Sequence, residues 1–322
     1  MSVSCDVERP RVSGRLTKVW PRITVVTPSY NQGQFLERAI VSVLSQKYPN
    51  LEYIVCDAGS TDNSVAILKK YEKRLTCWTS EPDRGQSDAI TKGWNMGTGD
   101  VLAWLNSDDL YYPGALFEVG RMFAENPNLK MVCGSVAHVD ENERKLRVKR
   151  PGPVAPEVLL PWADMPPQVG TFIRRDIFDE LGGPRLDLHY VMDWELWLRV
   201  TLKYPARDIA FSDKVLAADR QWSGTKTLNA GGRDAAEGRK VLEELFGDGR
   251  LSPRLRGLER VALARTWWRQ SKGELRKGMR CSALLSLGKA VRLAPKNFPP
   301  VKVLRQFKRI LFHSATNGKL GA

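Results

Sequence analysis

Three polar segments, each directly after an apolar and β-branched stretch, contain side chains whose types are suited to chemistry. These segments are 27–31, 57–62 and 106–109. The carboxylates of Asp57, Asp108 and Asp109 would repel one another if the fold gathered them, and a bound divalent cation is the usual remedy. Mg²⁺ or Mn²⁺ suits such a set, held by one or two carboxylates and by the oxygens of a ligand's diphosphate.

The elements that would position these segments alternate along the first 130 residues. β-Branched runs predict strands at 23–27, 51–56, 76–79, 100–105 and 130–135. Apolar residues at helical spacing predict helices between Asn31 and Pro49 and at 64–71, 86–94 and 115–125. Strands that are apolar on both faces and alternate with helices indicate a parallel α/β sheet.

In such sheets ligands bind at the carboxyl ends of the strands, so the three polar segments are expected to meet at one edge. Each segment alone also fits a simple turn or a helix cap. Their joint occurrence at three strand ends favours a binding site over three unrelated turns.

The remainder of the chain is less regular up to residue 227 and strongly helical near its end. We expect a charged turn or hairpin at 141–150, a Pro-rich loop at 151–167, and helices at 173–181 and 193–204. Helical spacing then predicts segments at about 257–270, 273–292 and 300–312, separated by Gly273 and by prolines.

The net charge of +14 is not spread evenly along the chain. Residues 1–227 carry equal numbers of basic and acidic side chains, so the whole excess lies in 228–322. Such asymmetry indicates parts with different roles. We expect a polar N-terminal arm at 1–20, a charge-neutral α/β domain at 21–227 and a basic helical region at 228–322.

Composition narrows the class of protein further. Five cysteines, an odd number without C-x-x-C spacing, and three scattered histidines predict neither a disulfide framework nor a zinc site. A reducing cytoplasm is therefore the expected compartment. No apolar run reaches the ~18 residues of a membrane-spanning helix, and the N-terminus lacks the apolar stretch of a secretory signal.

Four motifs in order resemble the family 2 glycosyltransferases, whose GT-A fold is a Rossmann-like α/β domain that binds nucleotide sugars. The matching stretches are Thr27-Pro-Ser-Tyr-Asn31, Asp57-Ala-Gly-Ser-Thr-Asp62, Gly97-Thr-Gly-Asp100 and Asn106-Ser-Asp-Asp-Leu110 with Pro113-Gly-Ala-Leu116. The resemblance covers about residues 21–227. It implies a mostly parallel sheet flanked by helices, here followed by a C-terminal basic α-helical appendage.

The resemblance also implies where a donor nucleotide binds. In such enzymes the loop after the first strand and the aspartate after the second strand hold the base. The matching residues here are Thr27, Pro28, Tyr30 and Asp57. Asp88, in the third helix, would line the same pocket, although it fits equally well a first-turn residue favoured by the helix dipole.

The D-x-D motif of the family corresponds to Asn106, Ser107 and Asp108. Asparagine in place of the first aspartate removes one charge, but its amide oxygen can still contact a ribose hydroxyl or the metal. Asp108 is therefore expected to hold the cation, Mg²⁺ or Mn²⁺, with Asp109 assisting. Many relatives complete the metal shell with a histidine from a later loop, where this chain has Gln-Trp at 221–222.

Inverting members need a general base that deprotonates the acceptor hydroxyl, usually an aspartate in a Glu-Asp pair that opens a helix. Asp193 is the matching residue, and Met192 replaces the first member of the pair. Burial beside Trp194 would raise the pKa of Asp193 towards the working pH, and capping the helix is its alternative role. Gln168 and Trp194 are expected on the acceptor side, with an arginine at 174–175 near the leaving diphosphate.

The implied activity is that of an inverting, hexosyltransferase-type enzyme that depends on a metal ion. The expected donor is a nucleotide sugar, with UDP as the carrier. The expected acceptor is a glycan or a lipid-linked molecule in surface polysaccharide synthesis. A dinucleotide oxidoreductase is set aside, because a glycine fingerprint is missing after the first strand.

The basic helical region allows two interpretations. In its last predicted helix four apolar residues share one face and the basic residues lie elsewhere, a pattern suited to an anionic membrane surface. The apolar residues are Val301, Leu304, Phe307 and Leu311. A peripheral position at the inner face of a membrane would follow; alternatively, the apolar face packs on the catalytic domain.

A nucleic-acid-binding α/β protein that uses the basic C-terminal helices is the alternative from a different class. The chain contains no recognised binding motif of that kind, and a carboxylate-lined edge would repel phosphate. We therefore expect no nucleic-acid partner.

Overall fold

The computed structural model describes residues 20–162 and 165–312, so the expected N-terminal arm lies outside the described residues apart from Trp20. The chain forms two compact units. Their described residues are 20–154 with 165–222, and 155–162 with 223–312. This division groups 155–162 with the C-terminal helices, whereas the sequence suggests a single boundary at 227.

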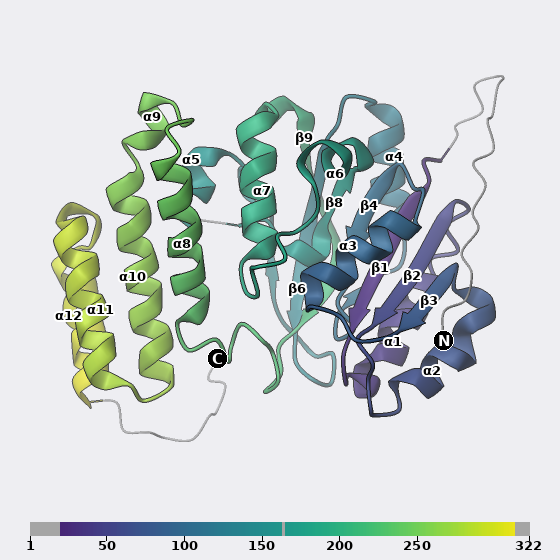
Figure 1. The fold of residues 1–322 in the computed structure, drawn as a ribbon, viewed down its shortest axis with the longest axis horizontal. Helices are drawn as coiled ribbons and strands as arrows, with labels where there is room; N and C mark the ends of the chain where they lie inside the picture. The colour runs from purple at the N-terminus through teal and green to yellow at the C-terminus, as the bar shows by residue number, and fades with distance from the viewer. Residues whose placement is uncertain (1–19, 163–164, 313–322) are drawn as a thin grey trace. The chain divides into compact units, whose positions relative to one another are not determined.

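The first unit is built on one sheet flanked by helices (Figure 1). Over the described residues the sheet has nine strands, in the order β3-β2-β1-β4-β8-β6-β9-β5, with β7 paired to β6. Four adjacent strands are parallel: β3 (Cys77–Ser80), β2 (Leu51–Asp57), β1 (Ile23–Ser29) and β4 (Val101–Trp104). Their helices are α1 (Gly33–Leu44), α2 (Ser64–Tyr71), α3 (Gln86–Met96) and α4 (Ala115–Glu125). The α/β fold class is confirmed, and these elements agree closely with the predicted ones.

The other half of the sheet is mixed rather than parallel. Strand β8 (Thr171–Arg174) runs antiparallel between β4 and β6 (Met131–Val139), and β9 (Ile209–Arg220) pairs parallel with β6 and antiparallel with β5 (Leu110–Tyr111). The expected hairpin at 141–150 is present, because β7 (Lys145–Lys149) pairs with β6. The helix predicted at 173–181 is wrong at its start: α6 (Arg175–Leu181) begins only after β8 ends.

The parallel strands form the core because both of their faces are covered. All seven residues of β1 are buried, and α3 approaches this strand closely. Gly93 permits the approach, since a Cβ at this position would lie 2.5 Å from Cγ1 of Val26. Trp94 and Trp104 are fully buried beside the same strands, with ring centroids 5.6 Å apart. The carboxyl ends of β1 and β4 are therefore held rigidly.

The described part of the second unit is helical (Figure 1, α5 in teal and the later helices green to yellow). Its helices are α5 (Pro156–Leu159), α8 (Arg233–Gly247), α9 (Pro253–Arg256), α10 (Glu259–Arg276), α11 (Arg280–Leu293) and α12 (Pro300–Phe312). The break predicted at Gly273 is wrong, because α10 continues through it. A Cβ on Gly273 would lie 2.3 Å from the backbone nitrogen of Gly232, so this glycine allows the start of α8 to approach α10.

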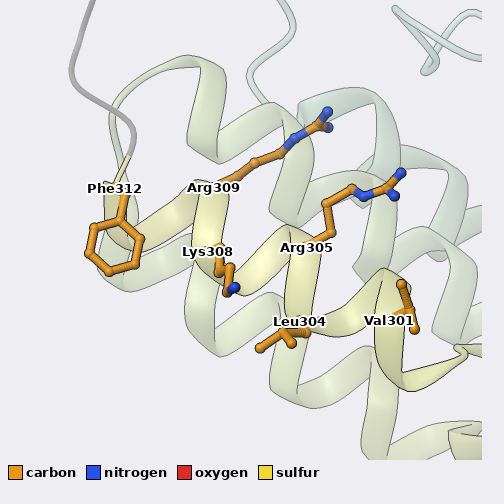
Figure 2. Close-up of a pocket in the computed structure, with 6 residues that line it drawn as sticks. All are labelled: Val301, Leu304, Arg305, Lys308, Arg309 and Phe312. Carbon is orange, nitrogen blue, oxygen red and sulfur yellow. The ribbon is translucent and has the colours of Figure 1, made fainter.

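Helix α12 carries both apolar and basic side chains around one pocket (Figure 2). The apolar ones are Val301, Leu304 and Phe312, and the basic ones are Arg305, Lys308 and Arg309. None of the helices within residues 20–162 and 165–312 combines the length and the apolar character that crossing a membrane requires.

Candidate active site

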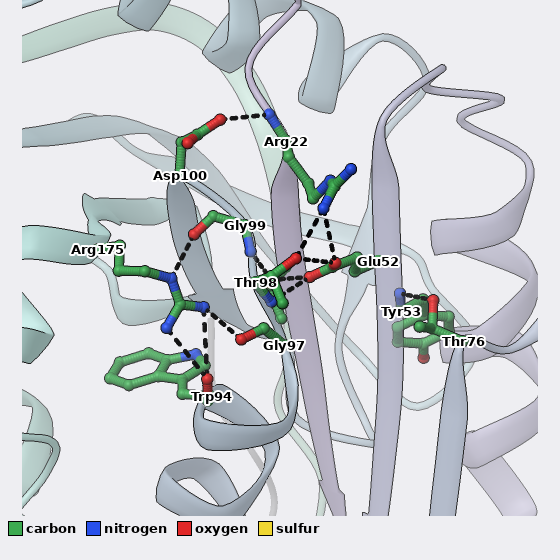
Figure 3. Close-up of polar contacts among 11 residues, drawn as sticks. Arg22, Glu52, Tyr53, Thr76, Trp94, Gly97, Thr98, Gly99, Asp100 and Arg175 are labelled. Atoms are coloured by element: carbon green, nitrogen blue, oxygen red, sulfur yellow. Dashed lines mark hydrogen bonds and ion pairs between the residues drawn. The ribbon is translucent and has the colours of Figure 1, made fainter. Parts of the chain in front are cut away.

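The motif at 97–100 lies at the opposite edge of the sheet from the predicted site, at the amino ends of the strands (Figure 3). Glu52 accepts hydrogen bonds from the Thr24 hydroxyl at 2.6 Å and from the Thr98 backbone N–H at 2.7 Å and hydroxyl at 2.6 Å. Burial raises the pKa of Glu52, but these bonds and the charge of Arg22 outweigh burial, and the pKa is lowered. This motif therefore joins β1, β2 and β4 and does not contribute to a site.

Both arginines at 174–175 are also structural. Arg175 donates to the backbone carbonyls of Gly99 at 2.6 Å and Gly97 at 2.9 Å (Figure 3). Arg174 donates to the carbonyl of Leu129 at 2.8 Å. The expectation that one of them lies near a diphosphate is wrong, because both guanidinium groups bind backbone around the amino ends of the strands.

At the carboxyl edge, the loops after β1 and β2 are joined to each other. The backbone N–H of Asn31 donates to the Ser60 hydroxyl at 2.8 Å, and the Thr61 N–H donates to the Asn31 side-chain oxygen at 2.9 Å. Asn31 adopts a positive φ of 49°, a conformation that asparagine tolerates better than most residues. The two loops thus form one rim above neighbouring strand ends.

Asp57 lies at the base of this rim with its carboxylate held in place. It accepts hydrogen bonds from the Ser60 N–H at 2.9 Å and hydroxyl at 2.5 Å, and from the Ser80 hydroxyl at 2.7 Å. The sequence does not single out Ser80, which is contributed by β3. Three donors give the carboxylate a fixed direction, as recognition of a polar ligand group requires.

The other residues predicted to hold a base differ in exposure. Tyr30 is 62% exposed on the rim, so its ring is available to a ligand. The Thr27 hydroxyl is instead buried and lies 3.0 Å from the Tyr53 hydroxyl. Pro28 is buried in β1. Thr27 and Pro28 therefore support the rim from inside the sheet.

Asp88 lies in the first turn of α3 and stabilises the loop before it. It accepts hydrogen bonds from the backbone N–H and the guanidinium of Arg84, both at 3.1 Å, and Lys92 lies 3.5 Å away. Burial raises the pKa of Asp88, yet these contacts lower it overall. The geometry favours the helix-start role that the sequence left open.

Asn106 is the centre of a hydrogen-bonded network just beyond β4. Its side-chain oxygen accepts from Gln86 at 2.7 Å, and its amide donates to Asp109 at 3.1 Å and to Gln168 at 3.2 Å. Gln168 in turn donates to the carbonyl of Trp104 at 2.8 Å. The structure thus brings two predicted site residues, Asn106 and Gln168, into direct contact, and adds Gln86, a partner of Asn106 that sequence spacing could not reveal.

Asp109 is engaged on both of its oxygens. One accepts from the Arg220 backbone N–H at 3.0 Å and the other from Asn106. Burial raises the pKa of Asp109 well above its usual range, and the nearby charges of Asp108 and Asp219 raise it further. A carboxyl that is buried and bonded in this way is poorly suited to a metal, so the expected assisting role of Asp109 does not fit its geometry.

Asp108 points towards a different partner. Its carboxylate accepts a hydrogen bond from the indole N–H of Trp222 at 2.9 Å, and its backbone carbonyl accepts from Arg220 at 2.8 Å. The neighbouring Ser107 donates to the side chain of Gln32. Burial raises the pKa of Asp108, while the bond from Trp222 lowers it. Trp222, one of the two residues that replace the expected histidine, therefore contacts the predicted metal ligand directly.

A protein-only metal cage is not formed by the residues that the structure describes, since none of their His, Cys, Asp and Glu side chains gather in threes around a possible ion. Asp108 alone offers a carboxylate at the predicted position. Mg²⁺ and Mn²⁺ tolerate such sites when phosphate oxygens of a ligand supply other positions. The donor set therefore fits a cation that binds together with a diphosphate.

Asp193 lies in the first turn of α7 (Met192–Lys203), where the sequence places it. Its carboxylate accepts the backbone N–H of Trp194 at 2.8 Å. Trp194 is completely buried, and Trp197 stacks on Trp104 with centroids 5.6 Å apart. Trp194 therefore anchors the helix in the core, and the acceptor contact expected of it does not fit this burial.

Comparison with known proteins shows which family the chain belongs to. Residues 24–182 match the model of the glycosyl transferase family 2. An uncharacterized glycosyltransferase of Mycobacterium tuberculosis (strain CDC 1551 / Oshkosh) is 30% identical over 184 residues, which cover 56% of this chain and 70% of the relative. The chain belongs to glycosyl transferase family 2. As a member of this family it is a glycosyltransferase.

Solved structures agree on the fold of this glycosyltransferase. S. aureus TarS 1–349 in complex with UDP-GlcNAc has a TM-score of 0.61 at 15% identity, with 90% of each chain covered. The mannosyltransferase PcManGT from Pyrobaculum calidifontis, in complex with GDP-Man and Mn²⁺, has a TM-score of 0.58 at 17% identity and covers 92% of this chain and 88% of that one. At these identities the likeness establishes the GT-A-like fold.

Proposed function

We propose that this glycosyltransferase is metal-dependent and inverting, and that it moves a hexose from a UDP-sugar to a glycan or lipid-linked acceptor in surface polysaccharide synthesis. The observation that carries the proposal is the common edge of β1, β2 and β4, where Asp57, Asp108 and the Asn106 network follow adjacent strand ends. Asp57 can then bind the nucleobase and Asp108 the cation of one bound nucleotide.

The donor base binds at the rim formed by the loops after β1 and β2. The Asp57 carboxylate only accepts hydrogen bonds, so it selects a base that offers a ring N–H, as uracil does. Tyr30 supplies an exposed aromatic surface beside it. The TarS neighbour was solved with UDP-GlcNAc, which supports UDP as the carrier.

Asp108 would hold the cation, with the donor diphosphate supplying further oxygens. When bound, Mg²⁺ or Mn²⁺ neutralises charge that grows on the leaving nucleoside diphosphate. Asn106 and Gln168 position the segment that carries Asp108, because their amides connect it to β4 and α3. The PcManGT neighbour was solved with GDP-Man and Mn²⁺, which supports this cofactor class.

Asp193 is the proposed general base. It removes the proton from the acceptor hydroxyl as the hydroxyl oxygen attacks the anomeric carbon, and the bond to the diphosphate oxygen breaks on the opposite face. Inversion follows from this single displacement. The backbone N–H of Trp194 bonds to Asp193, and burial of the Trp194 ring holds the start of α7 in position.

A donor screen tests the proposal. The purified chain is incubated with Mg²⁺ or Mn²⁺ and a panel of UDP-, GDP- and dTDP-sugars, and release of the nucleoside diphosphate is measured. We expect release from a UDP-sugar, its loss with EDTA, and its loss in Asp108→Ala. Release that persists in EDTA or in Asp108→Ala would refute metal dependence through this residue.

The role of Asp193 as the general base is tested separately by Asp193→Asn. The variant should bind donor as the wild type does, measured by calorimetry, but should lose transfer by ~10²-fold or more. Asp179→Asn is the matched control, because Asp179 is an exposed carboxylate of α6 in the same unit and lies outside the proposed machinery. Full transfer by Asp193→Asn would place the base elsewhere.

A further inference from the structure

Helix α12 packs on the second unit through only one narrow side. Gln306 and Ile310 are buried, and Val303 is half-buried against α10 and α11 residues. These three positions follow one another at helical spacing and define the inner face. The rest of the helix surface is exposed in the described structure.

The exposed surface of α12 contains large apolar side chains that its packing does not require. Leu304 is 53% exposed and Leu311 43%. Val301, Phe307 and Phe312 are exposed as well. Phe307, Leu311 and Leu304 fall on a continuous stripe next to the inner face, because three- and four-residue steps return to the same side of a helix. Exposed apolar groups that share a stripe mark interaction surfaces more often than isolated ones do.

Basic side chains border this stripe. Figure 2 shows Arg305, Lys308 and Arg309 on α12 around a shallow hollow that they share with three apolar side chains. The apolar members are Val301, Leu304 and Phe312. We call this set, with Phe307, Leu311 and Lys302, the α12 surface.

The positive charge at the α12 surface is not balanced by acidic residues nearby in the sequence. No aspartate or glutamate follows Glu274, and Glu274 itself is buried, where it accepts bonds from Ser282 and Ser286. Burial lowers the pKa of Lys272, and the charges of Arg276 and Arg309 lower it further. The field around α12 therefore favours a negatively charged partner.

We propose that the α12 surface docks this chain on an anionic lipid bilayer, with the apolar stripe entering the headgroup region and the basic residues contacting lipid phosphates. An amphipathic helix that lies in the membrane plane needs both an apolar face and basic flanks, and α12 presents both outward. The partner is therefore a bilayer, because its acyl chains can accept the apolar stripe and its anionic headgroups can bind the basic residues.

Two other occupants fit the α12 surface less well. A nucleic acid would pair with the basic residues but would leave the Leu304 and Leu311 side chains in water. A second copy of the chain, joined through the same surface, would bring Arg305, Lys308 and Arg309 against their own equivalents, and like charges directly opposed destabilise an interface.

Vesicle binding by the full chain tests the proposal. The protein is sedimented with phosphatidylcholine vesicles that contain or lack phosphatidylglycerol, in the absence of donor and cation. Failure of docking and failure of sugar transfer are thereby separate outcomes. We expect binding only to the anionic vesicles, and weaker binding at high salt.

Two double variants remove the parts of the α12 surface one at a time. Arg305→Gln with Lys308→Gln should weaken binding about 25-fold, since each charge near an anionic surface contributes roughly fivefold. Leu304→Gln with Leu311→Gln should weaken it about tenfold or more. Lys69→Gln with Lys73→Gln, and Val41→Gln, are the matched controls on exposed positions of the first unit.

Folding is checked by circular dichroism, and all substituted side chains are exposed. Equal binding to neutral and anionic vesicles, or unchanged binding in both double variants, would overturn the proposal. So would a dimer that Leu304→Gln with Leu311→Gln converts to a monomer, or tighter binding to duplex DNA or RNA than to vesicles.

Discussion

Replacement of Glu52 by glutamine is expected to lower the stability of the first unit without changing its chemistry. Glu52 accepts three hydrogen bonds at 2.6–2.7 Å from Thr24 and Thr98, and Arg22 lies 3.6 Å from it. Bonds to a charged acceptor stabilise by about 1.5–3 kcal/mol each, and neutral ones by about 0.5–1.5 kcal/mol. Glutamine keeps the shape of the side chain but removes the charge.

A loss of roughly 1 kcal/mol at each of two or three bonds gives a decrease of about 2 kcal/mol in the free energy of unfolding. For a unit of this size such a change lowers Tm by about 4–8 °C. Calorimetry at pH 7 measures the shift of the first transition. Glu72→Gln is the control, because Glu72 is exposed on the same unit.

The pH dependence of this effect has a definite sign. The pKa of Glu52 is lowered in the folded chain. Its stabilisation is thus present above the unfolded pKa of about 4.3 and is lost as the pH falls through the lower folded pKa. The Tm difference between wild type and Glu52→Gln should therefore shrink below about pH 4. Equal Tm values at pH 7, or a difference that persists undiminished in acid, would refute the reasoning.

Three further substitutions have expected outcomes. Gly93→Ala should destabilise by about 1–3 kcal/mol because its Cβ would overlap Val26, and a thermal melt measures the loss; an unchanged Tm would contradict the close packing of α3. Trp222→Phe should lower the Mn²⁺ concentration for half-maximal activity by roughly 3–10-fold, because the indole N–H no longer competes for the Asp108 carboxylate; a higher requirement would contradict this. Asn31→Ala should weaken donor binding by roughly tenfold with kcat nearly unchanged, since it removes the side-chain bond from Thr61 that helps to join the two rim loops; an unchanged KM would contradict their role.

Strand ends and helices of the parallel half were predictable because their signals are local. Continuous β-branched runs and helical spacing each extend over a single element, as in β1 and α1. Strand β9 was missed because Asp213 and Lys214 interrupt its apolar pattern where the strand is exposed. Strand β8 was missed because its four residues run directly into α6.

The site was predictable only to the level of segments. Spacing placed Asn106 and Asp108 at a strand end, but their partners Gln86, Gln168 and Trp222 lie far away along the chain. Nothing periodic relates such positions, because long-range hydrogen bonds depend on how loops meet in the folded chain. The direction in which a carboxylate points, as for Asp109, follows from those partners and not from the motif.

The hydrogen-bonded network explains why residue 106, where the resemblance leads one to expect the first aspartate of a D-x-D motif, is an asparagine. The amide nitrogen of Asn106 lies 3.1 Å from an oxygen of Asp109, and burial already raises the pKa of Asp109 well above its usual range. A carboxylate at 106 would replace this donor with a second acceptor and would add a negative charge beside a buried acidic pair. Such a change costs several kcal/mol unless a proton or a cation compensates. Asparagine thus supplies the buried Asp109 with a donor, and of the two carboxylates only Asp108 remains for the proposed cation.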